Sequence, residues 1–155
     1  MPRLLVQRRL AQRCLVVPGL VAVLISGLTA FARTAQPATV LDGVYTSAQA
    51  DRGRRAYRQY CTYCHHDDLL GGEDLKVVPP ALVGLAFTEQ WVGKTVGGYF
   101  SKVSGTMPWE RTPLTAPVYA DIVAYIFKEN GYPAGTRELP ADAVRLDRIQ
   151  IVPLR

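Results

Sequence analysis

The sequence predicts an all-α fold, a small and mostly helical domain with long loops. Two segments, residues 45–61 and 115–131, have apolar residues at helical spacing and residues typical of helix ends. The segments between them are rich in glycine, aspartate and proline, and no run alternates apolar and polar residues as a half-buried strand does. A chain of 155 residues holds one modest domain. Because few helices and many loops bury little apolar surface, we expect a metal, a disulfide or a cofactor to hold the core together.

Residues 1–32 have the pattern of a secretory signal peptide. An arginine-rich start precedes an uncharged, apolar segment, residues 14–32, which ends in Ala30-Phe31-Ala32, an A-x-A cleavage site. The alternative is an uncleaved membrane anchor, because the uncharged segment is close to the length of a membrane span. Since Pro18 and several small residues weaken its apolar character, we predict cleavage and export to the periplasm.

The net charge of +5 does not predict nucleic-acid binding, because it is concentrated in the signal segment. Of the 18 basic residues, four lie in residues 1–32, and the other 18 − 4 = 14 stand against 13 acidic residues. The remainder of the chain therefore has a net charge of +1. That balance does not predict the basic surface that phosphate binding needs.

The first helix is predicted over residues 45–61, after an irregular segment, residues 33–44. Thr46 is placed to cap this helix, and Gln49 three residues later completes a capping-box pattern. Three residues recur at four-residue spacing and share one face: Gly53, Tyr57 and Cys61. Glycine inside a helix costs about 1 kcal/mol relative to alanine, so Gly53 predicts the close approach of another helix.

A weaker helical pattern covers residues 87–103, with glycines at three positions inside it. It is flanked by two predicted loops, residues 66–84 and 104–114, which are rich in residues typical of turns.

The clearest helix is predicted over residues 115–131. Thr115 is at its N-cap, Pro117 is in its first turn, and Asn130-Gly131 ends it. Its apolar stripe consists of Val118, Ile122, Tyr125 and Ile126. The tail, residues 132–155, is predicted to be extended or irregular.

The stretch "CTYCHH", residues 61–66, contains the residues of the chain that can form a disulfide, bind a metal or attach a cofactor. A catalytic disulfide between Cys61 and Cys64 would be expected at the start of a helix in a βαβ unit, but here the pair ends a helix. Structural zinc needs four ligands, usually from two paired motifs, and no second motif follows. Both readings fit poorly.

Cys-x-x-Cys-His is the attachment signature of c-type haem, and this third reading fits better. Two sulfurs one helical turn apart can form thioethers with the two vinyl groups of one haem. The next residue, His65, can then lie beneath the iron as an axial ligand. His66 would point about 100° away on a helical turn, and we therefore predict that it is a surface residue.

Met107 is the predicted second axial ligand. The chain has two methionines, and Met1 belongs to the signal segment. Met107 lies in a predicted loop between Gly105 and Pro108. A thioether favours Fe(II) relative to a second imidazole, and it leaves no site on the iron for oxygen or peroxide. The predicted metal ligands are therefore His65 and Met107.

The chain resembles the class I c-type cytochromes. The resemblance rests on CTYCH at 61–65, PALVG at 80–84, TMP at 106–108 and the last helix at 119–127. More narrowly, it is similar to cytochromes associated with or fused to quinoprotein alcohol dehydrogenases, through "DLLGG", "PPALVG", "TMP" and "YADIVAYIFKENGYPAG". It implies a small cytochrome c-like domain, residues 45–155, with long loops wrapped around one covalently bound haem c and an extended C-terminal tail.

The resemblance also implies contacts. The carbonyl of Pro80 would accept a hydrogen bond from the Nδ1–H of His65. The first and last helices would cross where Gly53 and Tyr57 meet Ile122 and Tyr125. The family often has glycine where His66 stands, so this position departs from the pattern. The aromatic residues that would line the haem pocket or reach its propionates, or else fill the core, are Trp91, Tyr99 and Trp109.

The predicted function is that of a periplasmic, monohaem electron carrier without catalytic residues. It would pass single electrons from a donor, for example a dehydrogenase, to an oxidase or another cytochrome, through weak and transient contacts. Contact with a membrane is expected only if the N-terminal segment is not cleaved. The alternatives are a haem subunit permanently bound to a quinoprotein dehydrogenase, and a haem peroxidase or gas sensor in which Met107 leaves the iron.

Overall fold

The computed structural model describes residues 38–72, 78–108 and 113–154. Their secondary structure is almost entirely helical, which confirms the predicted all-α class. The predicted signal peptide, residues 1–32, lies outside the described residues, so it stays a prediction. Within the three described ranges, no helix combines the length and apolar character needed to cross a bilayer.

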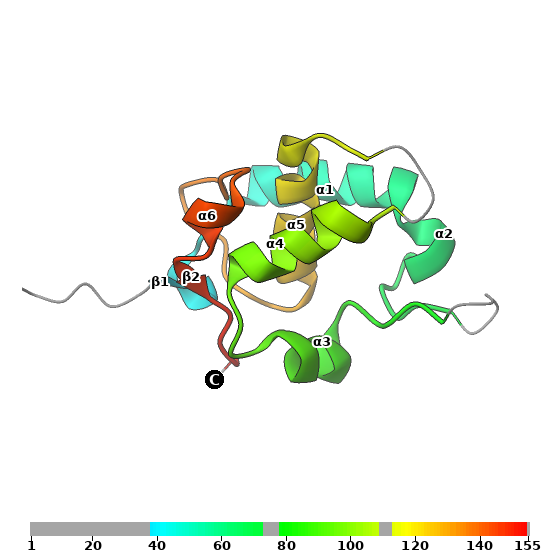
Figure 1. Ribbon diagram of the computed structural model, residues 1–155, viewed down its shortest axis with the longest axis horizontal. Helices are drawn as coiled ribbons and strands as arrows, with labels where there is room; N and C mark the ends of the chain where they lie inside the picture. Colours follow the sequence, from blue (N-terminus) through cyan, green and yellow to red (C-terminus); the bar gives the residue numbers. More distant parts are fainter. Residues whose placement is uncertain (1–37, 73–77, 109–112, 155) are drawn as a thin grey trace, which may run out of the picture. The chain divides into compact units, whose positions relative to one another are not determined.

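The elements follow one another along the chain as Figure 1 colours them. They are β1 (Ala38–Thr39), the 3₁₀ helix η1 (Val40–Asp42), α1 (Ser47–Tyr60), α2 (Thr62–His65), α3 (Gly84–Trp91), α4 (Val96–Thr106), α5 (Ala116–Glu129), α6 (Ala143–Leu146) and β2 (Ile149–Gln150).

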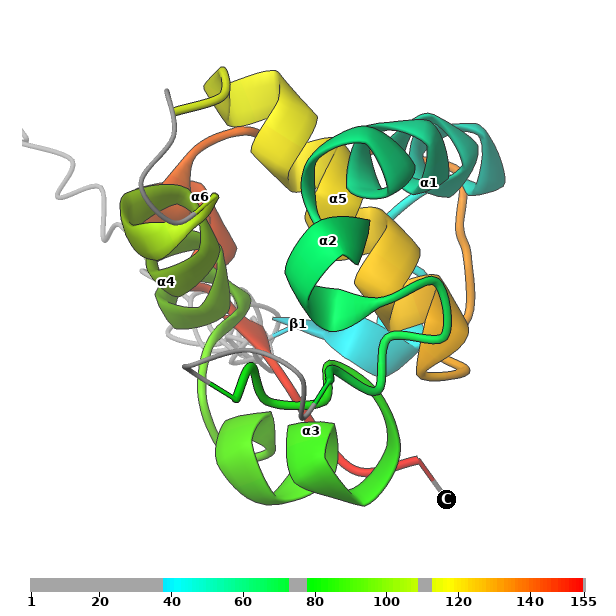
Figure 2. The same cartoon turned by 90° about the vertical axis from the view of Figure 1, so that its right-hand side faces the viewer.

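The last long helix, α5, forms the centre of the core. Its buried residues include the run from Ile122 to Phe127, so it is covered on nearly all sides. Its predicted ends are confirmed, with Pro117 in the first turn and Asn130 at the C-cap, although Thr115 makes no capping bond with its side chain. In Figures 1 and 2, α1 crosses α5 near the top and α3 lies at the bottom of the described unit.

The close approach predicted at Gly53 is the crossing of α1 and α5. A Cβ built on Gly53 would overlap the carbonyl oxygen of Asp121 and would lie 2.9 Å from the Cβ of Tyr125. One turn further along α1, the rings of Tyr57 and Tyr125 pack with their centroids 5.3 Å apart. The absence of a side chain at Gly53 therefore sets how closely the two helices lie.

The helix predicted over residues 87–103 is two helices, α3 and α4. The break falls at residues 92–95, where Gly93 has a φ of +86°, a conformation that glycine adopts without strain. Thr95 then starts α4, because its hydroxyl accepts a hydrogen bond from the amide of Gly98 at 2.9 Å. The glycines noted in the sequence therefore mark a helix end as well as weak helical propensity.

The C-terminal tail is more ordered than predicted, and a buried glutamine on α1 holds part of it. The tail contains α6 and β2, and β2 pairs in parallel with β1. Thr46 caps α1 as predicted, but Gln49 does not complete a capping box. Its buried amide instead exchanges two hydrogen bonds with the backbone of Leu139, at 2.8 and 3.1 Å. The glutamine was therefore assigned the wrong role, because its partner lies 90 residues away.

The turn after α2 has an unusual backbone at His66. This residue has a φ of 55° and a ψ of 171°, a region that is essentially restricted to glycine. Its imidazole lies against Gly72, where a Cβ would overlap the ring. A histidine at position 66, where the family often has glycine, is therefore held in a strained backbone conformation.

Replacing Gly53 by valine should destabilise the haem-loaded protein by about 1–3 kcal/mol or more, because the new side chain must push α1 away from α5. Thermal unfolding followed by helical circular dichroism measures this. Gly105→Ala is the matched control, since no atom lies within 4 Å of a Cβ at Gly105 in α4. The control should retain or gain up to about 1 kcal/mol of stability. Equal melting of Gly53→Val and the wild type would contradict the crossing.

Replacing His66 by glycine should stabilise the protein by roughly 1 kcal/mol, because relief of backbone strain exceeds the entropy that glycine adds to the unfolded chain. His66→Ala is the control, since it removes the imidazole and keeps the strain. Chemical denaturation of all three proteins gives the free energies of unfolding. A loss of stability in His66→Gly matching that of His66→Ala would mean that the ring contact with Gly72 outweighs the strain.

Candidate functional site

The end of α1 and the short helix α2 place the two cysteines. Cys61 ends α1 and its amide donates to the carbonyl of Tyr57 at 2.8 Å. The carbonyl of Cys61 then accepts bonds from the amides of Cys64 and His65, at 3.1 and 2.9 Å. The two cysteines and the histidine are therefore held on one tight helical turn.

Both thiols are free and half-buried in the structure. Burial, and secondarily the nearby Cys64, raises the pKa of the Cys61 thiol to about 12. A catalytic cysteine needs a lowered pKa, because the thiolate is the nucleophile. The raised pKa of Cys61 therefore gives no support to a thiol oxidoreductase that uses this thiol as its nucleophile.

His65 is buried, and its ring is oriented by a loop that follows it. The Nδ1 atom lies 3.1 Å from the carbonyl oxygen of Pro80, the contact implied by the resemblance. Since a carbonyl can only accept, Nδ1 carries the proton and Nε2 keeps a free electron pair. Burial lowers the pKa of His65, partly offset by the bond to Pro80, so the imidazole is neutral. A neutral ring with a free Nε2 can bind a metal.

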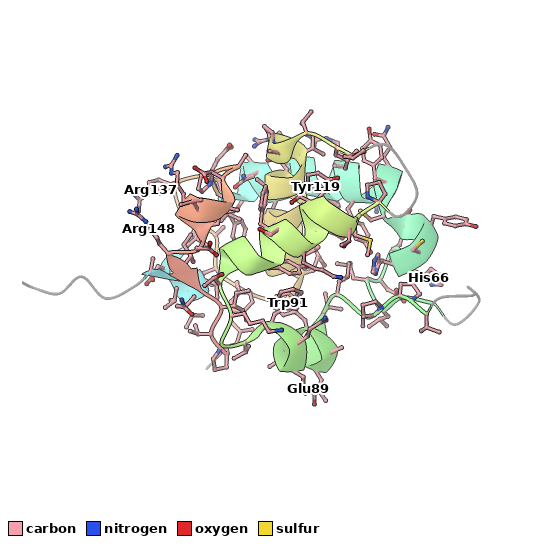
Figure 3. The ribbon with its side chains drawn as sticks, in the orientation of Figure 1. His66, Glu89, Trp91, Tyr119, Arg137 and Arg148 are labelled. Carbon is pink, nitrogen blue, oxygen red and sulfur yellow. The ribbon has the colours of Figure 1, made fainter. Side chains whose placement is uncertain are left out.

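Met107 lies at the C-terminal end of α4. Its amide donates to the carbonyl of Val103 at 3.0 Å, and its own carbonyl accepts from the hydroxyl of Tyr119 at 2.6 Å. The same hydroxyl accepts from the amide of Leu114 at 2.9 Å. Tyr119, which Figure 3 labels near the start of α5, therefore holds both sides of the loop that contains Met107.

A cavity of about 370 Å³ brings the predicted site residues together. Its walls come from both cysteines and their turn, the loop before α3, and helices α3, α4 and α5. The lining consists of Tyr57, Tyr60, Cys61, Tyr63, Cys64, His65, Pro80, Leu82, Gln90, Trp91, Tyr99, Lys102, Val103, Thr106, Met107, Pro108, Ile122 and Ile126. All four predicted residues, Cys61, Cys64, His65 and Met107, line this one space.

Two of the three aromatic candidates also line the cavity. Trp91 and Tyr99 pack against each other with ring centroids 4.6 Å apart. Figure 3 shows Trp91 on the side of α3 that faces α4, opposite the exposed Glu89. Trp109 lies outside the described residues. His66 does not appear in the lining of the cavity, in agreement with its predicted direction.

Sequence reasoning missed the polar residues that position the site. Tyr57 donates to the carbonyls of His65 and His66, at 3.2 and 2.8 Å. Asn130 donates to the carbonyl of Leu82 at 2.9 Å and accepts from the amide of Gly84 at 3.1 Å. The sequence predicted Asn130 as a helix-ending residue. It did not predict the bonds of its side chain to the backbone at Leu82 and Gly84, because these residues lie 46–48 positions earlier in the chain.

The residues present fit a haem. A flat, largely apolar cofactor suits a cavity walled by aromatic and aliphatic side chains. Two thiols on its rim can anchor the cofactor, and His65 offers a free nitrogen to it. Tyr99 lines the same space, and its buried hydroxyl has no hydrogen-bond partner among the described residues, as expected where a further group belongs. The zinc reading gains no support, because no three His, Cys, Asp or Glu side chains gather within the described ranges.

Comparison with known families gives one match. Residues 48–126, just over half of the chain, match the family model described as cytochrome C oxidase, cbb3-type, subunit III. No curated protein and no solved structure gave a match. These comparisons therefore support the class of c-type cytochromes and give no support to the narrower resemblance to dehydrogenase-associated cytochromes.

The matched region contains the cysteine pair, His65, Met107 and most of α5. The chain therefore belongs to the family of cbb3-type cytochrome c oxidase subunit III domains, and it is a haem electron-transfer protein whose haem c is bound covalently through Cys61 and Cys64.

Proposed function

We propose that this protein is a monohaem electron carrier of the periplasm, with His65 and Met107 as the axial ligands of the iron. The observation that carries the proposal is the single cavity that both residues and both cysteines line. The bound haem supplies one-electron exchange between Fe(II) and Fe(III).

The imidazole of His65 is preorganised as a metal ligand. The carbonyl of Pro80 accepts a hydrogen bond from Nδ1–H, which fixes the tautomer, and burial keeps the ring neutral. The bond to Pro80 also raises the basicity of Nε2. Asn130 holds the loop at Leu82 and Gly84, so the Pro80 carbonyl is supported by α5.

Met107 is held by its backbone, and its side chain is left to act as a ligand. The amide of Met107 bonds within α4, and its carbonyl bonds to Tyr119 on α5. A thioether at this position would fill the second axial site and favour the reduced iron. With both sites filled, no position is left for a substrate, which favours electron transfer over peroxidase or gas-sensing chemistry.

The partners are redox proteins, with a dehydrogenase as the class of donor and an oxidase or a second cytochrome as the acceptor. The family description names an oxidase subunit, so a terminal oxidase is the acceptor that we favour. The narrower alternative, a subunit permanently bound to a quinoprotein dehydrogenase, remains a prediction from the resemblance in sequence.

The reduced wild-type protein should bind no carbon monoxide at neutral pH, because Met107 occupies the open side of the iron. Met107→Ala should bind it and should have a lower midpoint potential, since the thioether is lost. Absorbance spectra of the reduced proteins with and without the gas measure this. Met107→His is the control, because an imidazole refills the site and should block the gas. Carbon monoxide binding by the wild type would favour the gas-sensor alternative.

The haem-containing protein in a periplasmic extract should elute from a size-exclusion column as a small, free protein. The reason is that a carrier forms transient contacts, which dilute extracts do not preserve. A haem stain of the fractions after denaturing electrophoresis locates the chain. Elution together with dehydrogenase activity at a larger size would favour the bound subunit. Retention of the Met1-containing chain in washed membranes would contradict cleavage of the signal.

A further inference from the structure

The Tyr99 hydroxyl is a buried polar group to which the described part of the chain gives no hydrogen-bond partner. The residue is 2% exposed, and among the described residues this hydroxyl is the buried side-chain polar atom without a hydrogen-bond partner. An unpaired hydroxyl in an apolar interior costs about 1–3 kcal/mol. Other buried tyrosines avoid this cost. Tyr45, for example, donates to the carbonyl of Tyr132 at 2.6 Å.

The ring of Tyr99 is fixed by aromatic neighbours, so the hydroxyl cannot readily turn towards solvent. Its centroid lies 4.6 Å from that of Trp91, 5.5 Å from that of Phe87 and 6.0 Å from that of Phe127. The residue also lines the cavity that contains the haem-attachment cysteines. The packing therefore fixes Tyr99 in the wall of the haem site.

The hydroxyl keeps its proton in this environment. Burial, and secondarily the nearby Cys61 thiol, raises the pKa of Tyr99. A neutral phenol has one O–H to donate, and an acceptor in the cavity would satisfy it. A bound c-type haem would place several acceptors in this cavity. They are its propionate oxygens, the thioether sulfur atoms of Cys61 and Cys64, and the sulfur atom of Met107.

We propose that the Tyr99 hydroxyl donates a hydrogen bond to an acceptor of the bound haem assembly and thereby raises its midpoint potential. The haem assembly means here the haem with its propionates and the sulfur atoms of Cys61, Cys64 and Met107. A donor places partial positive charge near the haem, which favours Fe(II) over the more positive Fe(III). Tyr99 is in this view a positioning and tuning residue of the electron-transfer site.

The test compares Tyr99→Phe with the wild type, both purified with haem attached. The midpoint potential is measured by spectroelectrochemistry, and the thermal melting of the oxidised protein is recorded. We expect a lower midpoint potential and a lower melting temperature for Tyr99→Phe. Tyr45→Phe is the matched control, because it removes a buried tyrosine hydroxyl whose partner is protein and whose ring does not line the cavity. That control should melt earlier and keep the wild-type potential.

The potential decides the outcome, since a purely structural role would destabilise both oxidation states alike. An unchanged or raised potential in Tyr99→Phe overturns the proposal, whatever the melting temperature does. A higher melting temperature also overturns it, because removing a truly unpaired hydroxyl relieves a cost. Phenylalanine keeps the ring packing, so the variant should fold and remain measurable.

A second variant locates the acceptor. In the Met107→Ala background, the shift caused by Tyr99→Phe should disappear if the acceptor is the Met107 sulfur. It should persist if the acceptor is a propionate or an attachment sulfur. This comparison applies once Tyr99→Phe alone has lowered the midpoint potential. The wild type, the two single variants and the double variant together form a double-mutant cycle, which measures the coupling between Tyr99 and Met107.

Discussion

The close contact of α1 with α5 at Gly53 is the constraint on which the rest of the structure depends. The first helix ends at Cys61, where the attachment turn begins. Tyr119 in the last helix and Asn130 at its C-cap hold the two loops of the site. A change in the distance between these helices would therefore move the attachment turn relative to both loops. Gly53 packs against the backbone of Asp121. The carboxylate of Asp121 also accepts two hydrogen bonds of 2.9 Å from Arg52, so a salt bridge joins the two helices at the same crossing.

The two loops are positioned by hydrogen bonds to backbone atoms of the chain. Asn130 bonds to the backbone at Leu82 and Gly84, and Tyr119 bonds to the backbone at Met107 and Leu114. Each such bond contributes only about 1 kcal/mol to stability. Their value lies in geometry, because each bond fixes the position of a loop segment beside the cavity. A site that is held in one arrangement needs little rearrangement when the iron changes charge, and this suits electron transfer.

The sequence predicted what depends on local spacing. The haem-attachment turn, the ends of α5 and the glycine at the helix crossing all follow from patterns within a few residues, such as Cys61, Cys64 and His65. The separation of α3 from α4 was missed, because glycine weakens a helix without saying whether the helix ends there. The roles of Gln49 and Tyr119 were also missed. The partner of Gln49 is 90 residues away, and Tyr119 bonds to carbonyl and amide groups that every residue has.

Burial shifts the pKa values of the ionisable groups around the cavity, and it would also affect the charge of a bound iron. Burial is the largest reason that the pKa values of Tyr57 and Tyr99 are raised and that of His65 is lowered. In each case the uncharged form is favoured, which is the behaviour of a site with a low local dielectric constant. An iron in the same site gains one positive charge on oxidation, and the same penalty applies to that charge. The walls of the cavity would therefore favour Fe(II) independently of the ligands, and a thioether ligand and a donor at Tyr99 would act in the same direction.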